Sequence, residues 1–221
     1  MIDDFFLDAS LLKIVSTLSI IFPLGWSGAR LKSSGYFGKV FFCFLLLGLV
    51  ADVLGWCVNA LRPANEFIHV FNSYALAEAL FFFWLVRSLS TASALRRLSF
   101  FFLVCAPVSW LVVLAWPVFK TGKLGQIMPF IVAYEVIISF LAGFGLLELA
   151  EKETHLLYSW RFWFLMGVFF YCFCTFFVMA FLGKELLFSL WPINNMINIL
   201  TYLFYCLGWW RYGQPRQQPM A

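Results

Sequence analysis

Residues 191–211 read WPINNMINILTYLFYCLGWWR, an apolar stretch that is long enough to cross a bilayer and yet carries polar side chains at regular intervals. At about 100° per residue, four of these side chains fall on one face of a helix and two more lie beside that face. The four are Asn194, Asn198, Thr201 and Tyr205, and the two are Asn195 and Tyr202. An amide without a hydrogen-bond partner in lipid costs roughly 2–7 kcal/mol, so this stripe must face protein or water.

The composition of the whole chain is that of an integral membrane protein. Of its 221 residues, 63% are hydrophobic and only 12% are charged, whereas soluble globular domains carry about 25% charged residues. The net charge of +4 reflects Lys and Arg in the connecting segments, so we expect no nucleic-acid partner. We expect the chain to lie in a lipid bilayer, as a multi-pass protein of the plasma membrane or of the inner membrane if the source is bacterial.

Seven apolar segments are each long enough to cross about 30 Å of hydrocarbon. They cover residues 9–29, 37–61, 67–88, 98–118, 127–149, 160–182 and 188–210. Because the connections between them are short, consecutive helices should be antiparallel neighbours. The sequence therefore predicts an all-α integral membrane protein, a compact bundle of seven transmembrane helices that forms a single domain over residues 1–221.

The distribution of Lys and Arg predicts the orientation of this bundle. The first residues, Met-Ile-Asp-Asp, lack the positive charge of a cleavable signal peptide, so we expect the first segment to remain as a helix. With the N-terminus outside, ten basic residues fall on the inner side: Arg30, Lys32, Lys39, Arg87, Arg96, Arg97, Lys152, Arg161, Arg211 and Arg216. Four fall on the outer side: Arg62, Lys120, Lys123 and Lys184. The positive-inside rule then favours an outside N-terminus and a cytoplasmic C-terminus.

Three carboxylic acids, Asp52, Glu78 and Glu135, lie inside predicted spans. Each would cost about 2.5–3.5 kcal/mol at the centre of a lipid-exposed helix, so they should face the interior of the bundle or be neutral. With the predicted orientation, these acids and the asparagines share one depth in the outer half. This predicts a polar cavity there. We expect it to be lined by Asp52, Asn59, Asn72, Tyr74, Glu78, Glu135, Asn194, Asn195, Asn198, Thr201, Tyr202 and Tyr205.

Neither a metal nor a cofactor is expected. The six cysteines are scattered through apolar runs, and the two histidines lie near opposite ends of the bundle, which excludes a three-histidine zinc site. The middle of the last segment carries no lysine that could bind retinal covalently. The same polar groups could instead be simple ties between helices, in which case the asparagine side chains should be paired with protein.

The preferred function is the binding and transport of a small polar or cationic solute in this cavity. A transporter would need a polar path that continues past Glu78 to the inner side, and a sealed, apolar inner half would count strongly against it. Two alternatives stay open: a seven-helix sensor or accessory subunit that signals to a cytoplasmic protein, and an intramembrane lipid-modifying enzyme that uses the acids. The sequence names no catalytic residue and favours a non-enzymatic role. It leaves homo-oligomer formation open.

Overall fold

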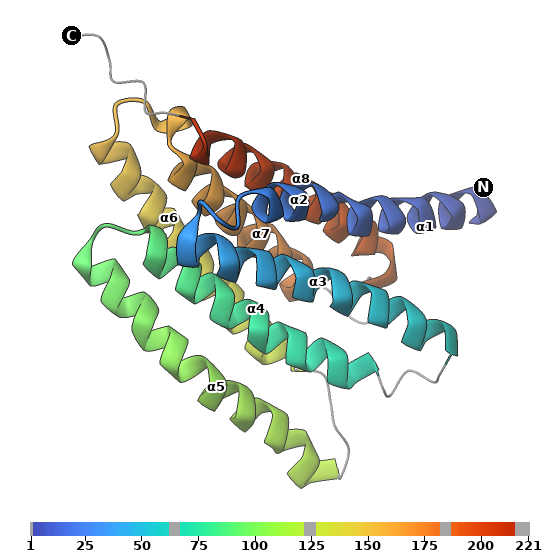
Figure 1. Cartoon of the computed structure of the whole chain (residues 1–221). Coiled ribbons are helices and arrows are strands. Elements are labelled where there is room, and N and C mark those ends of the chain that lie inside the picture. The colour runs from blue at the N-terminus through green and yellow to red at the C-terminus, as the bar shows by residue number, and fades with distance from the viewer. Residues whose placement is uncertain (1, 62–66, 122–126, 182–186, 215–221) are drawn as a thin grey trace.

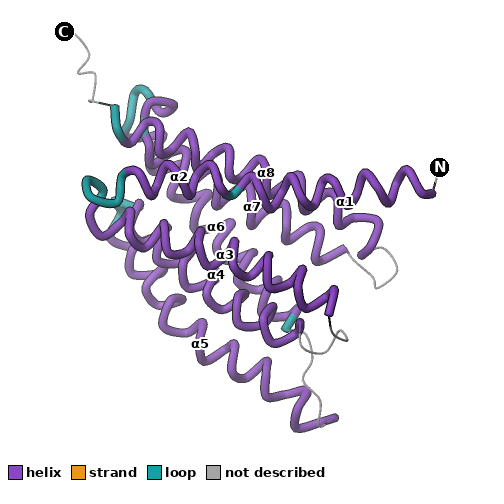
Figure 2. Tube along the Cα trace, turned by 45° about the vertical axis from the view of Figure 1, so that its right-hand side comes forward, coloured by secondary structure: helices purple, strands orange, loops and turns teal. Residues whose placement is uncertain are grey.

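The computed structural model describes residues 2–61, 67–121, 127–181 and 187–214, and this part of the chain is helical apart from short connections (Figure 2). The α-helices are α1 (Ile2–Ser19), α2 (Ile21–Ala29), α3 (Gly35–Leu61), α4 (Phe67–Leu89), α5 (Ser93–Thr121), α6 (Met128–Lys152), α7 (Trp160–Phe181) and α8 (Leu187–Tyr212). A short 3₁₀ helix, η1 (Leu156–Tyr158), lies before α7. The described chain contains no strand, so the all-α prediction is confirmed.

Six segments of the described chain are long and apolar enough to cross a membrane: Leu11–Ala29, Gly35–Gly55, Ile68–Leu89, Ser93–Phe119, Met128–Lys152 and Trp160–Met179. The chain is therefore built as a multi-pass membrane protein. The helix α8, which carries the polar stripe, is not among the six. At 26 residues it is about 39 Å long, which is enough to span the hydrocarbon core.

The first apolar segment differs from the single helix that the sequence predicts, because it is divided into α1 and α2 at Ile20. Pro23 explains the division. Proline has no N–H to donate to the carbonyl of Ser19, four residues earlier, and its ring collides with that carbonyl. The hydroxyl of Ser19 donates to the carbonyl of Ser16 at 2.5 Å, which satisfies another backbone group beside the break.

The pair α1 and α2, together with α3, α4, α6, α7 and α8, forms a ring, and α5 lies outside it (Figure 1). Around the ring, α8 packs on α7, α7 on α6, α6 on α4, α4 on α3 and α3 on α2. The pair α1 and α2 closes the ring by packing on α8. Among the described elements, α5 packs mainly along α4 and α6, and much of its surface consists of exposed apolar side chains such as Phe101, Val108 and Trp116.

The helices α7 and α8 approach each other closely because glycine faces an aromatic ring on each side. A Cβ atom on Gly167 of α7 would come within 2.7 Å of the Tyr205 ring of α8. A Cβ atom on Gly208 of α8 would come within 3.0 Å of the Phe164 ring of α7. Small residues let membrane helices pack at short distance. This contact fixes the polar stripe of α8 against the rest of the bundle.

The two ends of the bundle differ in the residues and connections that they hold. The basic end holds the α2–α3, α4–α5 and α6–α7 connections, with Arg30, Arg96 and Arg161 among its residues. The N-terminal end is the opposite one, where α1, α4, α6 and α8 begin.

Candidate functional site

A cavity of about 180 Å³ lies inside the ring, in the half nearer the N-terminal end. All six ring segments contribute side chains to it, and α5 contributes none. Its polar and ionisable lining consists of Lys13, Ser16, Thr17, Asp52, Tyr74, Glu78, Tyr134, Glu135, Tyr171, Thr175, Asn194, Asn195, Asn198, Thr201, Tyr202 and Tyr205. The rest of the lining is Phe44, Gly48, Phe71, Ala75, Phe82, Ile131 and Met179.

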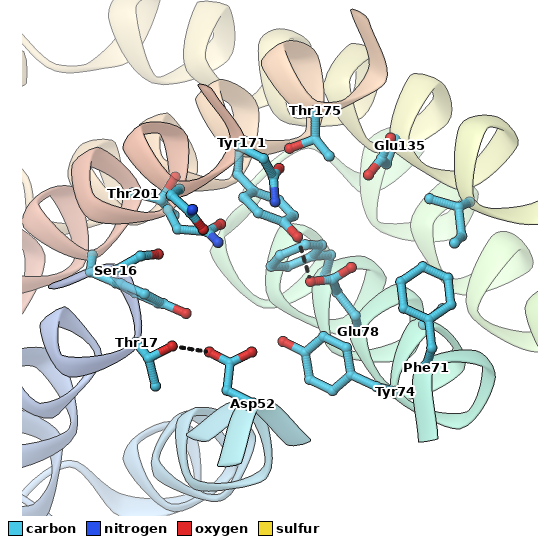
Figure 3. A pocket seen from close by; sticks show the side chains of 18 of the residues that line it. Ser16, Thr17, Asp52, Phe71, Tyr74, Glu78, Glu135, Tyr171, Thr175 and Thr201 are labelled. Carbon is cyan, nitrogen blue, oxygen red and sulfur yellow. Dashed lines mark hydrogen bonds between the residues drawn. The ribbon is translucent and has the colours of Figure 1, made fainter. Parts of the chain in front are cut away.

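Glu78 of α4 is held at the centre of this cavity by two tyrosines. The hydroxyl of Tyr171 donates a hydrogen bond to Oε1 at 2.9 Å, and the hydroxyl of Tyr134 donates to Oε2. Figure 3 shows the carboxyl group between α4 and the ring of Tyr171. Because each carboxyl oxygen has a hydroxyl donor, the acid that the sequence placed at mid-membrane joins α4 to both α6 and α7.

Asp52 of α3 occupies the side of the cavity next to α1. Its side chain is exposed, unlike those of Glu78 and Glu135. The hydroxyl of Thr17 donates to its Oδ2 at 3.2 Å, and the hydroxyl of Tyr74 points toward the space between Asp52 and Glu78 (Figure 3). The three acids therefore follow one another across the cavity, with Glu78 in the middle.

Several buried polar atoms in the cavity wall have no hydrogen-bond partner within the described part of the chain. They are Glu135 Oε2, Thr175 Oγ1, Asn194 Oδ1, Asn195 Nδ2, Thr201 Oγ1 and the Tyr205 hydroxyl. All but Asn194 belong to side chains that are at most 5% exposed. A buried polar group that lacks a partner costs about 1–3 kcal/mol. These atoms come from α6, α7 and α8, so one wall of the cavity is rich in unused hydrogen-bonding capacity.

Ten of the twelve residues that the sequence predicted for the site lie around this one cavity. Asn72 does not: it is buried, its backbone carbonyl oxygen accepts a hydrogen bond from the indole of Trp110 at 2.9 Å, and it belongs to the contact between α4 and α5. Asn59 lies in α3, and its side chain is outside the described residues.

The prediction missed polar lining residues on three helices. Lys13, Ser16 and Thr17 recur at i, i+3 and i+4 of α1, which is a polar stripe on one helical face. Tyr171 and Thr175 of α7 are likewise four residues apart. Both spacings could have been found in the sequence. The role of Tyr134 as a partner of Glu78 had no such signal, because it depends on how α6 packs against α4.

Toward the basic end, the cavity is closed by four buried rings, which we call the aromatic floor: Phe41, Phe81, Phe164 and Trp209. The Phe41 ring lies 4.9 Å from Phe164, 5.5 Å from Phe81 and 5.6 Å from Trp209, measured between centroids. Most of these contacts are edge-to-face, a favourable aromatic geometry. The polar path past Glu78 that a transporter would need is therefore blocked in this structure.

On its side facing the basic end, the aromatic floor is contacted by a basic residue. Arg30, which follows α2, donates a hydrogen bond from Nη1 to the carbonyl oxygen of Trp209 at 2.5 Å. Its guanidinium also lies 5.4 Å from the centroid of the Trp26 ring. The end of α2 is thus tied to α8 at the level where the cavity ends.

The described residues contain no cluster of three or more His, Cys, Asp or Glu side chains that could hold a metal ion. The cavity is thus equipped for hydrogen bonding and for interaction with positive charge. Its lining has three acids and one base, Lys13.

Comparison of the chain with protein-family models, with curated protein sequences and with solved structures found no match.

Proposed function

We propose that this protein binds a small polar or cationic solute in the cavity enclosed by α1, α3, α4, α6, α7 and α8. The observation that carries the proposal is the wall of unpartnered polar atoms on α6, α7 and α8. If the asparagines only tied helices together, their polar atoms should be paired, whereas Asn194 Oδ1 and Asn195 Nδ2 have no partner in the described chain. A solute with matching donors and acceptors would satisfy these groups.

The volume of the cavity limits the size of the solute. Pockets for drug-sized ligands measure about 300–1,000 Å³, and an apolar cavity of about 150 Å³ holds one benzene ring. At about 180 Å³, this cavity fits a solute of about one ring in size. The aromatic side chains of Phe44, Phe71 and Phe82 would provide its apolar contacts.

We place this cavity in a bundle of seven spans with the N-terminus outside and the C-terminus in the cytoplasm. The length of α8 and its packing along α7 support the seventh span. The excess of Lys and Arg at the basic end supports the orientation. The cavity would then face the outer half of the membrane, and the aromatic floor would separate it from the cytoplasm.

The test is a thermal-shift screen of the detergent-solubilised protein against small amines, amides, polyols, amino acids and nucleobases. We expect at least one class to raise the unfolding temperature, because ligand binding stabilises the folded state by mass action. The Glu78→Gln variant should show a smaller increase, because the amide that replaces the carboxylate can no longer accept hydrogen bonds from both Tyr134 and Tyr171. The matched Glu148→Gln variant should keep it, because Glu148 lies outside the cavity and pairs with Lys152 at 2.7 Å. A screen in which no compound stabilises the protein would contradict the proposal.

Sensing is the second candidate function, and the closed aromatic floor favours it over transport. Passage of a solute would require Phe41 and Trp209 to separate, whereas a sensor needs only binding. Uptake of the stabilising solute into proteoliposomes decides between the two. Accumulation above that of protein-free liposomes would establish transport, and binding without accumulation would support a sensor or accessory subunit.

A further inference from the structure

Within the cavity, the free hydrogen-bonding atoms fall into two groups of different chemistry. The first group offers acceptors, Glu135 Oε2 and Asn194 Oδ1, and Figure 3 draws the Thr175 hydroxyl on the same side of the site as Glu135. The second group can donate: Asn195 Nδ2 and the hydroxyls of Thr201 and Tyr205. Because Figure 3 draws Glu135 and Thr201 on opposite sides of the site, a ligand that satisfies both groups needs hydrogen-bond donors at one end and an acceptor at the other.

The acid that is free to meet the ligand is Glu135 and not Glu78. Both oxygens of Glu78 already accept hydrogen bonds from Tyr134 and Tyr171. The Oε2 atom of Glu135 has no partner in the described chain, and the side chain is 1% exposed. A buried acid whose oxygen is unpaired is stabilised most by a positively charged donor.

The basic residue of the cavity does not serve this purpose. Lys13 of α1 lines the side of the cavity where Thr17 meets Asp52, and Figure 3 shows Asp52 and Glu135 on opposite sides of the drawn site. An ammonium group supplies three donors, which matches the two acceptor atoms and the hydroxyl of the first group. A ligand carboxylate would instead meet three acids across the cavity.

We infer that the solute is a small monocationic amine whose ammonium binds Glu135 and Thr175, and whose other end presents a neutral acceptor to Asn195 and Thr201. This inference rests on the proposed function and adds the charge, polarity and orientation of the ligand. It excludes anions, and it disfavours zwitterions because their carboxylate would lie among Asp52, Glu78 and Glu135.

The experiment uses probes of one ring that differ in charge: benzylamine, the isosteric benzyl alcohol and benzoate. Their affinities are measured by isothermal titration calorimetry on the detergent-solubilised full chain. We expect benzylamine to bind at least tenfold more tightly than benzyl alcohol and benzoate to bind least. Adding a ring hydroxyl as the distal acceptor, in 3-hydroxybenzylamine, should tighten binding further.

Two matched variants assign the effect to Glu135. In Glu135→Gln, the preference for the amine over the alcohol should disappear, because the neutral amide no longer favours a positive charge. In Glu78→Gln, the preference should persist at a reduced level, since the same charge is removed from an acid already paired with tyrosines. The reverse result would overturn the assignment. The comparison of probes on the unmodified chain stands even if Glu135→Gln fails to fold.

The remaining outcomes separate this inference from the function on which it rests. Equal binding of amine and alcohol, or tighter binding of benzoate, would overturn the amine inference and leave solute binding intact. If none of these probes binds and the broader screen also finds no stabilising compound, the proposed function itself fails.

Discussion

The two halves of the bundle fill their interiors differently, one with aromatic rings and the other with polar groups around a cavity. Toward the basic end, rings such as Phe41, Phe164 and Trp209 fill the space and are fully buried. Toward the N-terminal end, acids, asparagines and hydroxyls surround a cavity, and several of their atoms have no partner within the described residues. The first half is filled by packed rings, and the second leaves a cavity lined by polar groups that could bind a solute. The contrast predicts that substitutions will have different consequences in the two halves.

The largest effect is expected in the aromatic floor. Phe164→Ala would remove a fully buried ring that packs on Phe41 and Trp209, and should lower the free energy of unfolding by about 3–5 kcal/mol. Phe140→Ala is the matched control, since Phe140 is 67% exposed on α6. Denaturation in detergent micelles measures both. Equal losses in the two variants would show that the floor is not a packed unit.

An intermediate effect is expected at the tyrosines that hold Glu78. Tyr134→Phe removes one hydroxyl and leaves Oε2 of a buried acid without its donor, which should cost about 1–3 kcal/mol. Tyr36→Phe, at a side chain that is 73% exposed, should change stability by less than about 0.5 kcal/mol. If Tyr134→Phe is as mild as this control in the same unfolding assay, Glu78 does not depend on its tyrosine for stability.

The smallest effect is also the most discriminating test, because two similar Thr→Val substitutions should change the stability of the protein in different directions. Thr17→Val removes a hydroxyl bonded to Asp52 and should destabilise the protein by about 0.5–1.5 kcal/mol. Thr175→Val removes a buried hydroxyl that has no partner, so the solute-free protein should be equally stable or more stable. Unfolding temperatures without added solute test this pair. A clear destabilisation by Thr175→Val would mean that its hydroxyl is already satisfied.

The sequence allowed most of the fold to be predicted, since long apolar runs and their connections define membrane helices with little ambiguity. Six of the seven predicted segments, all but 9–29, lie within the corresponding α-helix or extend one residue beyond its bounds. The break at Ile20 was missed although Pro23 lies inside the apolar pattern, and a proline there indicates an interrupted helix.

The site was predictable where spacing along one helix decides which side chains share a face. Tyr74 and Glu78 are four residues apart and both line the cavity. Asn72 is six residues before Glu78, so at about 100° per residue it lies on a different face of α4, where Trp110 of α5 contacts its backbone carbonyl. The prediction considered depth in the membrane and not direction around the helix. Which tyrosine would meet Glu78 depends on contacts between helices, and one sequence does not contain that information.

The break between α1 and α2 makes the ring asymmetric. The helix α2 packs on both α3 and α8, whereas the main neighbour of α1 in the described chain is α8. On the α1 side of the break, the hydrogen bond from Thr17 to Asp52 links α1 to α3. Within the described residues, the seam between these two helices is therefore the side of the ring with the least packing, and the exposed carboxylate of the cavity lies on it. A solute that entered the cavity through this seam would first have to part the Thr17–Asp52 hydrogen bond before it could reach Glu135 on the far side of the site.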